Sequence, residues 1–420
     1  MTIHRGRTYL EKHRYSPRYI FNPPRADLGM VLTIPCHNEP DVVKTLDSLE
    51  ICQKPPCEVE VLVIVNASED HPQAILQQND HSIRQISHWI EASSKKFTYH
   101  LLNFPALPQK HAGVGLARKI AMDEAVDRLE QVEYPRGIII GLDADTLVAP
   151  NYLKEIWNHF QQHPKSEAAS IYFEHPTQGK EYITRIYQGI IRYELFLRYY
   201  IEALRYAGYP FAYHTIGSAM AVRSEAYQRQ GGMNRRKAGE DFYFLQKFIA
   251  QGTLSEIHST CVYPSPRPSQ KVPFGTGRAI SEWMEKDTLS YPAYNLQTFE
   301  DLKHFCANIS SLYTSDSYVM PDSLRSFFET EGFQEKLAEI RQHVSTEVSF
   351  VKRFYQYFDA LKVLKYVHFS RDHFYPNEDI YPVAVKLGDK VFSQLPKNTP
   401  LLNLLGMYRR FQRREESYQT

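Results

Sequence analysis

Residues 138–146 read IIIGLDADT, and this stretch decides the fold. Its apolar first half predicts a buried strand, because strands covered on both faces are nearly continuous apolar runs. The carboxylates of Asp143 and Asp145 follow directly. Ligands of open parallel sheets bind beyond the carboxyl ends of the strands. The stretch therefore predicts an α/β fold with this acidic pair in its binding site.

Strands and helices alternate at short intervals around this stretch. Such alternation favours a mostly parallel sheet with helices on both faces. Beyond about residue 288 the pattern is helical and contains no candidate catalytic motif. The further predicted strands cover 30–34, 59–65, 97–102, 217–222 and 257–263. The predicted parts are an irregular, basic N-terminal extension (1–27), an α/β domain (28–285) and a mainly helical C-terminal region (286–420).

Composition excludes several classes of protein. The net charge of +1 over 420 residues gives no general attraction to nucleic acid. The five cysteines are odd in number and include no CxxC pair, which argues against a disulfide framework or a zinc ribbon. No signal peptide is recognisable in the basic residues 1–25, and no apolar run is long enough to span a bilayer. We expect a cytoplasmic protein.

The acidic pair suits a divalent cation. Two carboxylates two residues apart repel each other unless a positive charge lies near them. A divalent metal that carries a diphosphate meets this need, because it prefers hard oxygen ligands. The alternative is a loop with two solvated aspartates, or the cap of a helix that begins near Asn151.

A second acidic pair, Glu240 and Asp241, precedes a helical stretch at 242–250. A carboxylate at a helix start can serve as a cap that interacts favourably with the helix dipole. The functional interpretation is a general base that removes a proton from an acceptor hydroxyl. The residues at this point leave both interpretations open.

Three further segments are candidate nucleotide contacts. The polar turn predicted at 66–70 begins with Asn66, and the glycine-containing segment 110–119 carries Lys110 and Arg118. The Pro- and Gly-rich loop 264–278 carries three cations suited to a diphosphate, namely Arg267, Lys271 and Arg278. Structural turns and solvated loop charges explain the same residues equally well.

Taken in order, these segments resemble the family 2 glycosyltransferases of GT-A fold, across roughly residues 28–285. The first strand and the turn after it, LTIPCHNE at 32–39, are similar to the family's opening motif. The resemblance implies that the nucleotide sugar contacts Pro35, Asn38, Glu39, Asn66, Lys110, Arg118, Asp143, Arg267, Lys271 and Arg278. The family usually has an acidic residue where this chain has Asn66.

The resemblance also implies a mechanism. Asp145 and Asp143 would bind Mg²⁺ or Mn²⁺, with His258 as a third candidate ligand. Asp241, next to Glu240, would be the base of an inverting transfer to a hydroxyl acceptor. The acceptor candidates are a glycan, a lipid-linked intermediate and a small metabolite.

Rival interpretations concern the whole chain and two of its helices. The rivals are a catalytically silent scaffold of the same fold and a sugar nucleotidyltransferase, whose Gly-rich loop after the first strand is missing here. The aromatic segment 180–214 is interpreted as a core helix, with an acceptor-binding or membrane-facing helix as the alternative. The basic amphipathic tail at 401–414 is interpreted as a docking helix with a solvated basic end, with peripheral contact with the inner face of the membrane as the alternative. The helical C-terminal region is also a candidate for a homo-oligomer contact.

Overall fold

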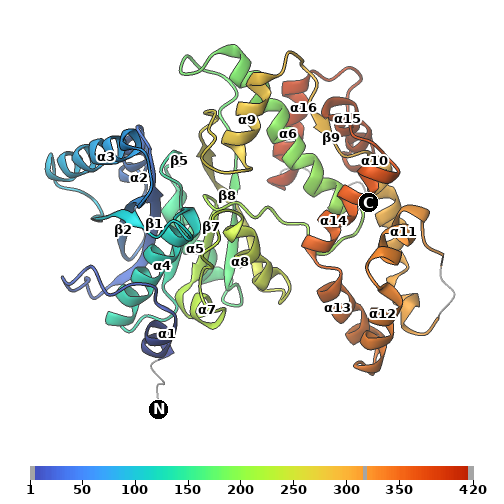
Figure 1. The fold of residues 1–420 in the computed structure, drawn as a ribbon, viewed down its shortest axis with the longest axis horizontal. Helices are drawn as coiled ribbons and strands as arrows, with labels where there is room; N and C mark the ends of the chain where they lie inside the picture. Colours follow the sequence, from blue (N-terminus) through green and yellow to red (C-terminus); the bar gives the residue numbers. More distant parts are fainter. Residues whose placement is uncertain (1–4, 316–318, 415–420) are drawn as a thin grey trace. The chain divides into compact units, whose positions relative to one another are not determined.

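The computed structural model describes residues 5–315 and 319–414 (Figure 1). Contacts divide the chain into two compact units. Unit 1 comprises Met1–Pro176 and Thr215–Ser281, and unit 2 comprises Thr177–His214 and Glu282–Thr420. Segment 177–214 thus belongs to the helical unit, whereas the predicted division lay at 285/286.

Unit 1 is built on an eight-stranded sheet with the order β3-β2-β1-β4-β7-β6-β8-β5. Its strands are β1 (Leu28–Cys36), β2 (Glu58–Ser68), β3 (Thr98–Leu107), β4 (Ile138–Gly141), β5 (Thr146–Val148), β6 (Ala168–Phe173), β7 (Met220–Arg223) and β8 (Leu254–Pro264). The pairs β3–β2, β2–β1, β1–β4 and β6–β8 are parallel, and the pairs β4–β7, β7–β6 and β8–β5 are antiparallel. The predicted mostly parallel sheet is confirmed.

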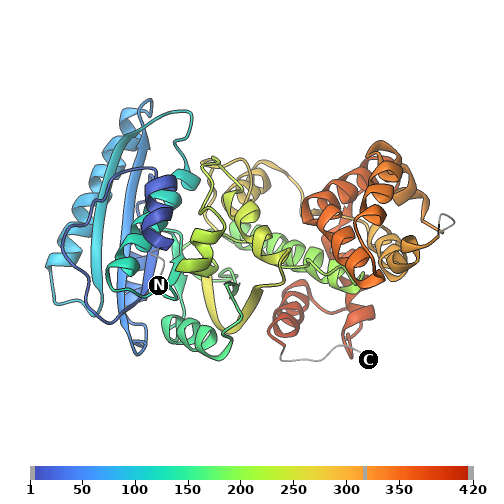
Figure 2. The ribbon, with the colours of Figure 1, turned by 90° about the horizontal axis from the view of Figure 1, so that it is seen from below.

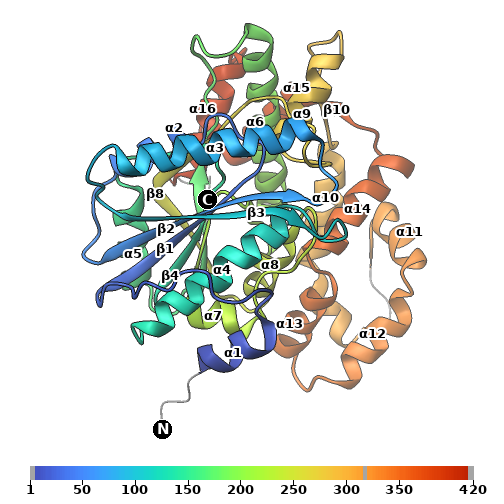
Figure 3. The same ribbon diagram turned by 60° about the vertical axis from the view of Figure 1, so that its left-hand side comes forward.

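Helices cover both faces of this sheet. Figure 3 shows α2 and α3 over one face of β1–β3 and α4 over the other. The helices of unit 1 are α1 (Arg5–His13), α2 (Val42–Glu50), α3 (Gln73–Glu91), α4 (Val114–Gln131), α5 (Tyr152–Gln162), α7 (Ser224–Arg229) and α8 (Glu240–Ile249), and α9 (Thr276–Glu285) begins in it. Every residue of β1, β2, β4 and β6 is buried, as expected for strands between two helical layers.

The register of β1 and β4 places two predicted motifs at one edge. The strands pair in parallel from Met30–Ile138 to Thr33–Gly141. The chain therefore leaves β1 and β4 at the same edge of the sheet, and the turn after Cys36 comes near the acidic pair after Gly141. The sheet itself brings these distant segments together.

The N-terminal segment differs from its prediction. Residues 1–27 were expected to be irregular because of their prolines, but helix α1 ends at His13, before the first of them. Tyr9 donates a hydrogen bond of 2.8 Å to Asp123 on α4, and Arg14 pairs with Asp127 at 3.1 Å. The segment is thus docked on α4. Strands β5 and β6 were also not predicted.

Unit 2 is helical apart from a two-stranded ribbon, in the part of the chain that is described (Figure 2). Its core joins Tyr199 and Leu204 of α6 to Phe299, Phe354 and Tyr366 of later helices. This packing explains why α6 groups with the C-terminal helices, and it confirms the interpretation of a core helix. The elements are α6 (Thr184–Tyr206), β9 (Pro292–Ala293), α10 (Leu296–Ala307), a 3-10 helix (Ile309–Tyr313), α11 (Asp322–Thr330), α12 (Phe333–Gln342), α13 (Glu347–Tyr357), α14 (Ala360–His373), β10 (Glu378–Asp379), α15 (Ile380–Val391) and α16 (Leu401–Gln412).

Helix α16 contains the basic tail considered for membrane contact. Its apolar residues Leu404, Leu405 and Tyr408 are buried in the core of unit 2, and Arg409 pairs with Glu194 at 2.8 Å. The apolar face of the helix is therefore covered within this unit. Among the described residues, no helix combines the length and the apolar character that crossing a membrane requires.

Candidate active site

The turn after β1 is held in place by α3. Asn38 adopts a left-handed conformation (φ +50°), which asparagine tolerates better than most residues. Its N–H donates to Asn79 Oδ1 at 2.8 Å, and Asn79 Nδ2 donates to the Asn66 carbonyl at 2.9 Å. Ser82 Oγ donates to the carbonyl of Glu39 at 2.7 Å. This network fixes Asn38 and the buried Glu39 at the sheet edge.

Asn66 lies inside β2, which continues to Ser68, so the turn predicted at 66–70 begins later than expected. Its carbonyl also accepts a hydrogen bond of 2.8 Å from His37 Nδ1. The side-chain Oδ1 of Asn66 is buried and has no hydrogen-bond partner among the described residues. Because buried polar atoms are rarely left unpaired, this oxygen is a candidate ligand contact.

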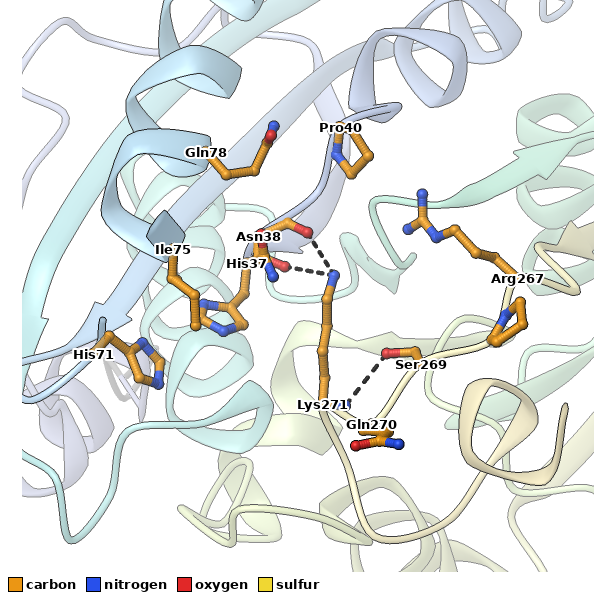
Figure 4. A pocket seen from close by; sticks show the side chains of 11 residues that line it. His37, Asn38, Pro40, His71, Ile75, Gln78, Arg267, Ser269, Gln270 and Lys271 are labelled. Carbon is orange, nitrogen blue, oxygen red and sulfur yellow. Dashed lines mark hydrogen bonds between the residues drawn. The ribbon is translucent and has the colours of Figure 1, made fainter. Parts of the chain in front are cut away.

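Two cations of the loop after β8 reach the turn after β1 (Figure 4). Lys271 Nζ donates to the carbonyls of His37 and Asn38 at 2.9 and 2.7 Å. Arg267 forms an ion pair with Glu39 and a second, at 3.1 Å, with Asp41. The loop is thereby attached to an acidic part of the sheet edge.

A pocket of about 590 Å³ lies between this loop, the turn after β1 and the start of α3. Its lining includes four side chains that carry or can carry positive charge and none that carries negative charge. The lining residues are His37, Asn38, Pro40, His71, Ile75, Gln78, Arg267, Pro268, Ser269, Gln270 and Lys271. Burial lowers the pKa of His37. The centroids of the His37 and His71 imidazole rings lie 4.7 Å apart. The pocket suits a ligand with a flat polar group and negative charge.

Asp143 and Asp145 follow β4 in a tight turn, in which the Thr146 N–H donates to the Asp143 carbonyl at 3.1 Å. The Asp145 side chain is half-buried. Burial, followed by the neighbouring Asp143 and Glu39, raises its pKa to about 7, although Arg267 and Lys271 oppose this effect. Negative charge is therefore in excess around Asp145.

Arg118, in the second turn of α4, joins the acidic pair to the second acidic motif. Its guanidinium forms ion pairs with Asp143 and with Glu240, and only 4% of its side chain is exposed. Burial opposes its charge, but Asp143, Glu240 and Asp241 outweigh burial and raise the pKa of Arg118. The resemblance implied that Arg118 faces the nucleotide, whereas here it bridges two carboxylates.

Asp241 lies in the first turn of α8 and is partly exposed. The Phe242 N–H donates to its Oδ1 at 2.7 Å. Burial raises the pKa of Asp241, while Arg118 and the backbone N–H groups of Phe242 and Gly217 oppose the rise. The carboxylate is thus fixed, accessible and more basic than an ordinary aspartate.

Three predicted site residues do not join this arrangement. His258 lies 3.8 Å from Glu256 and is among the groups that lower the pKa of His159, after burial and His163. The β8 residue that pairs with Thr146, next to the acidic turn, is Pro264, and His258 lies six positions before it along the strand. The other two are Lys110, which is exposed after β3, and Arg278, which is on α9.

No group of three or more His, Cys, Asp or Glu side chains is arranged to hold a metal ion by itself, as far as the chain is described. The predicted set of Asp143, Asp145 and His258 is therefore not assembled as three ligands. Two carboxylates, Asp143 and Asp145, stay together at the sheet edge. Their number is typical of a cation that takes its remaining ligands from a bound phosphate and from water.

Several residues of this site were not predicted. Asn79 and Ser82 are buried polar residues on α3, and their positions on the side facing the sheet were the available signal. Asp41 and His71 have no such signal, because only the fold brings them to the loop after β8. Gly217 was predicted only as the first residue of a strand, yet a Cβ there would lie 2.2 Å from Arg118 Nη1.

The mostly parallel sheet with acidic residues at its edge resembles the GT-A fold of glycosyltransferases that the sequence suggested. The sequence comparison agrees: residues 32–231 match the model described as glycosyl transferase family 2. No curated protein matches the sequence significantly.

Solved structures give more distant similarities. Residues 1–349 of S. aureus TarS share 12% identity at a TM-score of 0.40, with 82% of this chain and 91% of that chain covered. The same protein in complex with UDP-GlcNAc shares 13% identity at a TM-score of 0.41, with the same coverage of both chains. The mannosyltransferase PcManGT from Pyrobaculum calidifontis, in complex with GDP-Man and Mn²⁺, shares 14% identity at a TM-score of 0.38. The alignment covers 91% of this chain and 92% of that chain. Similarity of this degree carries no conclusion about substrate or mechanism.

Proposed function

We propose that the protein transfers a sugar from a nucleotide-sugar donor to a hydroxyl acceptor, with inversion at the anomeric carbon and with the help of Mg²⁺ or Mn²⁺. The observation that carries the proposal is the surroundings of the Asp143–Asp145 turn. On one side lie Glu39, Arg267 and Lys271, and on the other lies the bridge from Arg118 to Glu240. The proposed donor site and the proposed base thus lie at one sheet edge.

The nucleotide is assigned to the pocket beside the turn after β1. The Asn66 Oδ1 is a buried acceptor without a partner in the described residues, and it suits an N–H group of a base. Lys271 and Arg267 supply positive charge next to the pocket, and a diphosphate binds such groups through charge-assisted hydrogen bonds. Their positive charge also stabilises the nucleoside diphosphate as it departs.

The carboxylate oxygens around Asp145 fit a divalent cation as ligands. Burial and two neighbouring carboxylates disfavour its ionised form, so a cation placed there relieves an existing repulsion. Asp145 would hold the metal together with Asp143. When bound, the ion would neutralise charge that develops on the diphosphate.

Asp241 is the proposed base. Its carboxylate is partly exposed, and the N–H groups of Gly217 and Phe242 orient it. A raised pKa improves proton abstraction near neutral pH. The acceptor hydroxyl gives its proton to Asp241 as its oxygen attacks the anomeric carbon, and the nucleoside diphosphate leaves from the opposite face. A single displacement of this kind inverts the configuration.

The test is release of nucleoside diphosphate from a panel of nucleotide sugars, with Mg²⁺, with Mn²⁺ and with EDTA. We expect one donor to be cleaved or transferred only with metal, and we expect Asp145→Ala and Asp241→Asn to abolish that reaction. If the wild-type protein binds no donor at any metal concentration, the proposal is wrong.

A further inference from the structure

The bridge formed by Arg118 has a geometry that differs from that of a ligand-binding arginine. Its two terminal nitrogens point to two different carboxylates, Asp143 after β4 and Glu240 at the start of α8. The side chain is almost completely enclosed. An arginine in this state has its terminal nitrogens engaged by the protein, and little of its surface faces a nucleotide.

The surrounding backbone is shaped to the guanidinium. A Cβ built on Gly217 would lie 2.2 to 2.4 Å from Nη1, Cζ and Nη2 of Arg118. Atoms cannot approach that closely, so any side chain at this position would push the guanidinium aside. The backbone of the same glycine is among the groups that lower the pKa of Asp241. Gly217 is therefore in contact with the guanidinium and with the proposed base at once.

A second connection links the same two helices. A Cβ on Gly115, in the first turn of α4, would lie 2.1 Å from the Arg236 carbonyl oxygen. Asn234 Nδ2 donates to the Glu240 carbonyl at 3.2 Å. The segment before α8 thus packs directly on the start of α4. Movement of Arg118 would be transmitted to the first turn of α8.

We propose that Arg118 is a positioning residue, which holds the donor-side carboxylate of Asp143 and the base-side residues Glu240 and Asp241 in fixed relation. This inference rests on the proposed function of the site. Arginine is required because its planar fork can hold two carboxylates, whereas the single ammonium of lysine cannot match that geometry. The residue acts on the reaction through its neighbours.

The proposal predicts which kinetic constant changes. An error of about 1 Å in the placement of a reacting group can cost about 100-fold in rate. We expect Arg118→Lys to lower kcat for transfer roughly 100-fold, while the donor dissociation constant stays within about threefold of wild type. A nucleotide contact would give the reverse pattern, since loss of binding alone raises KM and leaves kcat unchanged.

Two further variants complete the experiment. Gly217→Ala keeps every charge but forces the guanidinium to move, and we expect the same loss of kcat with donor affinity retained. Arg128→Lys is the matched control, because Arg128 forms another buried pair, with Glu60 at 2.6 Å, near the other end of α4. It should keep wild-type kcat.

The donor dissociation constant is measured by isothermal titration calorimetry, and kcat is measured from initial transfer rates. Both are measured for the wild type and the three variants. Weakened donor binding with unchanged kcat in Arg118→Lys, or wild-type kinetics in Gly217→Ala, would overturn the proposal. If Arg118→Lys does not fold, Gly217→Ala decides. Absence of any transfer by the wild-type protein would instead refute the proposed function.

Discussion

Replacing Asp145 with asparagine should stabilise the metal-free protein at pH 8. The pKa of Asp145 rises from 3.8 to about 7 on folding, mainly through burial and the carboxylates of Asp143 and Glu39. Because the folded state binds this proton more tightly than the unfolded state, the free energy of unfolding falls as pH rises from about 4 to about 7. A rise of about 3 pKa units contributes about 4 kcal/mol to the free energy of unfolding at low pH, and this contribution is lost above pH 7.

Asparagine has a similar shape and no charge, so it removes this loss. We expect the melting temperature of Asp145→Asn to exceed that of the wild type by roughly 10 °C at pH 8, since each kcal/mol shifts a domain of this size by about 2–4 °C. At pH 4 the two proteins should melt together. The measurement is thermal unfolding in EDTA between pH 4 and 8.

Metal supplies the opposite control. Saturating Mn²⁺ should raise the melting temperature of the wild type at pH 8 and leave Asp145→Asn unchanged. Asp80→Asn, which removes an exposed carboxylate from α3, should behave as the wild type throughout. Equal pH profiles for the wild type and Asp145→Asn would refute the account of the acidic turn.

Three more predictions follow from the geometry. His258→Ala should leave the Mn²⁺ concentration for half-maximal activity within twofold, because His258 lies beside Glu256; a tenfold rise would restore it as a ligand. Gly115→Ala should lower the free energy of unfolding by about 1–3 kcal/mol in urea, since its Cβ would overlap the Arg236 carbonyl; an unchanged midpoint would contradict this close packing. Arg267→Ala should raise the donor KM by about 10- to 100-fold in steady-state assays, as expected when a charge-assisted hydrogen bond worth about 1.5–3 kcal/mol is lost; an unchanged KM would exclude the contact.

Most of the sheet was predictable because its strands are buried. The apolar runs at 30–34, 59–65 and 138–142 predicted β1, β2 and β4, and each strand or the turn after it carries site residues. Strand β5 has only three residues, too few for any periodicity. Helix α1 was missed because the prolines that suggested an irregular segment begin only after its last residue.

The chemistry of the site was only partly predictable. Asp143, Asp145 and Asp241 were found because they follow a buried strand or precede a helix. Arg118 and Glu240 are 122 positions apart in the sequence, so only the tertiary structure reveals the bridge between them. His258 was suggested by the resemblance to the family, and the register of β8 places it six positions before the residue that pairs with Thr146.

The central claim is that one carboxylate serves the donor and another serves the acceptor. The most direct test is to measure donor affinity with Mn²⁺ and the rate of transfer for Asp145→Asn and Asp241→Asn side by side. The account predicts that Asp241→Asn binds the donor as the wild type does but transfers at least 100-fold more slowly, as expected for loss of a general base. It predicts that Asp145→Asn loses metal-dependent donor binding. Full transfer by Asp241→Asn, or unchanged metal-dependent binding by Asp145→Asn, would contradict it.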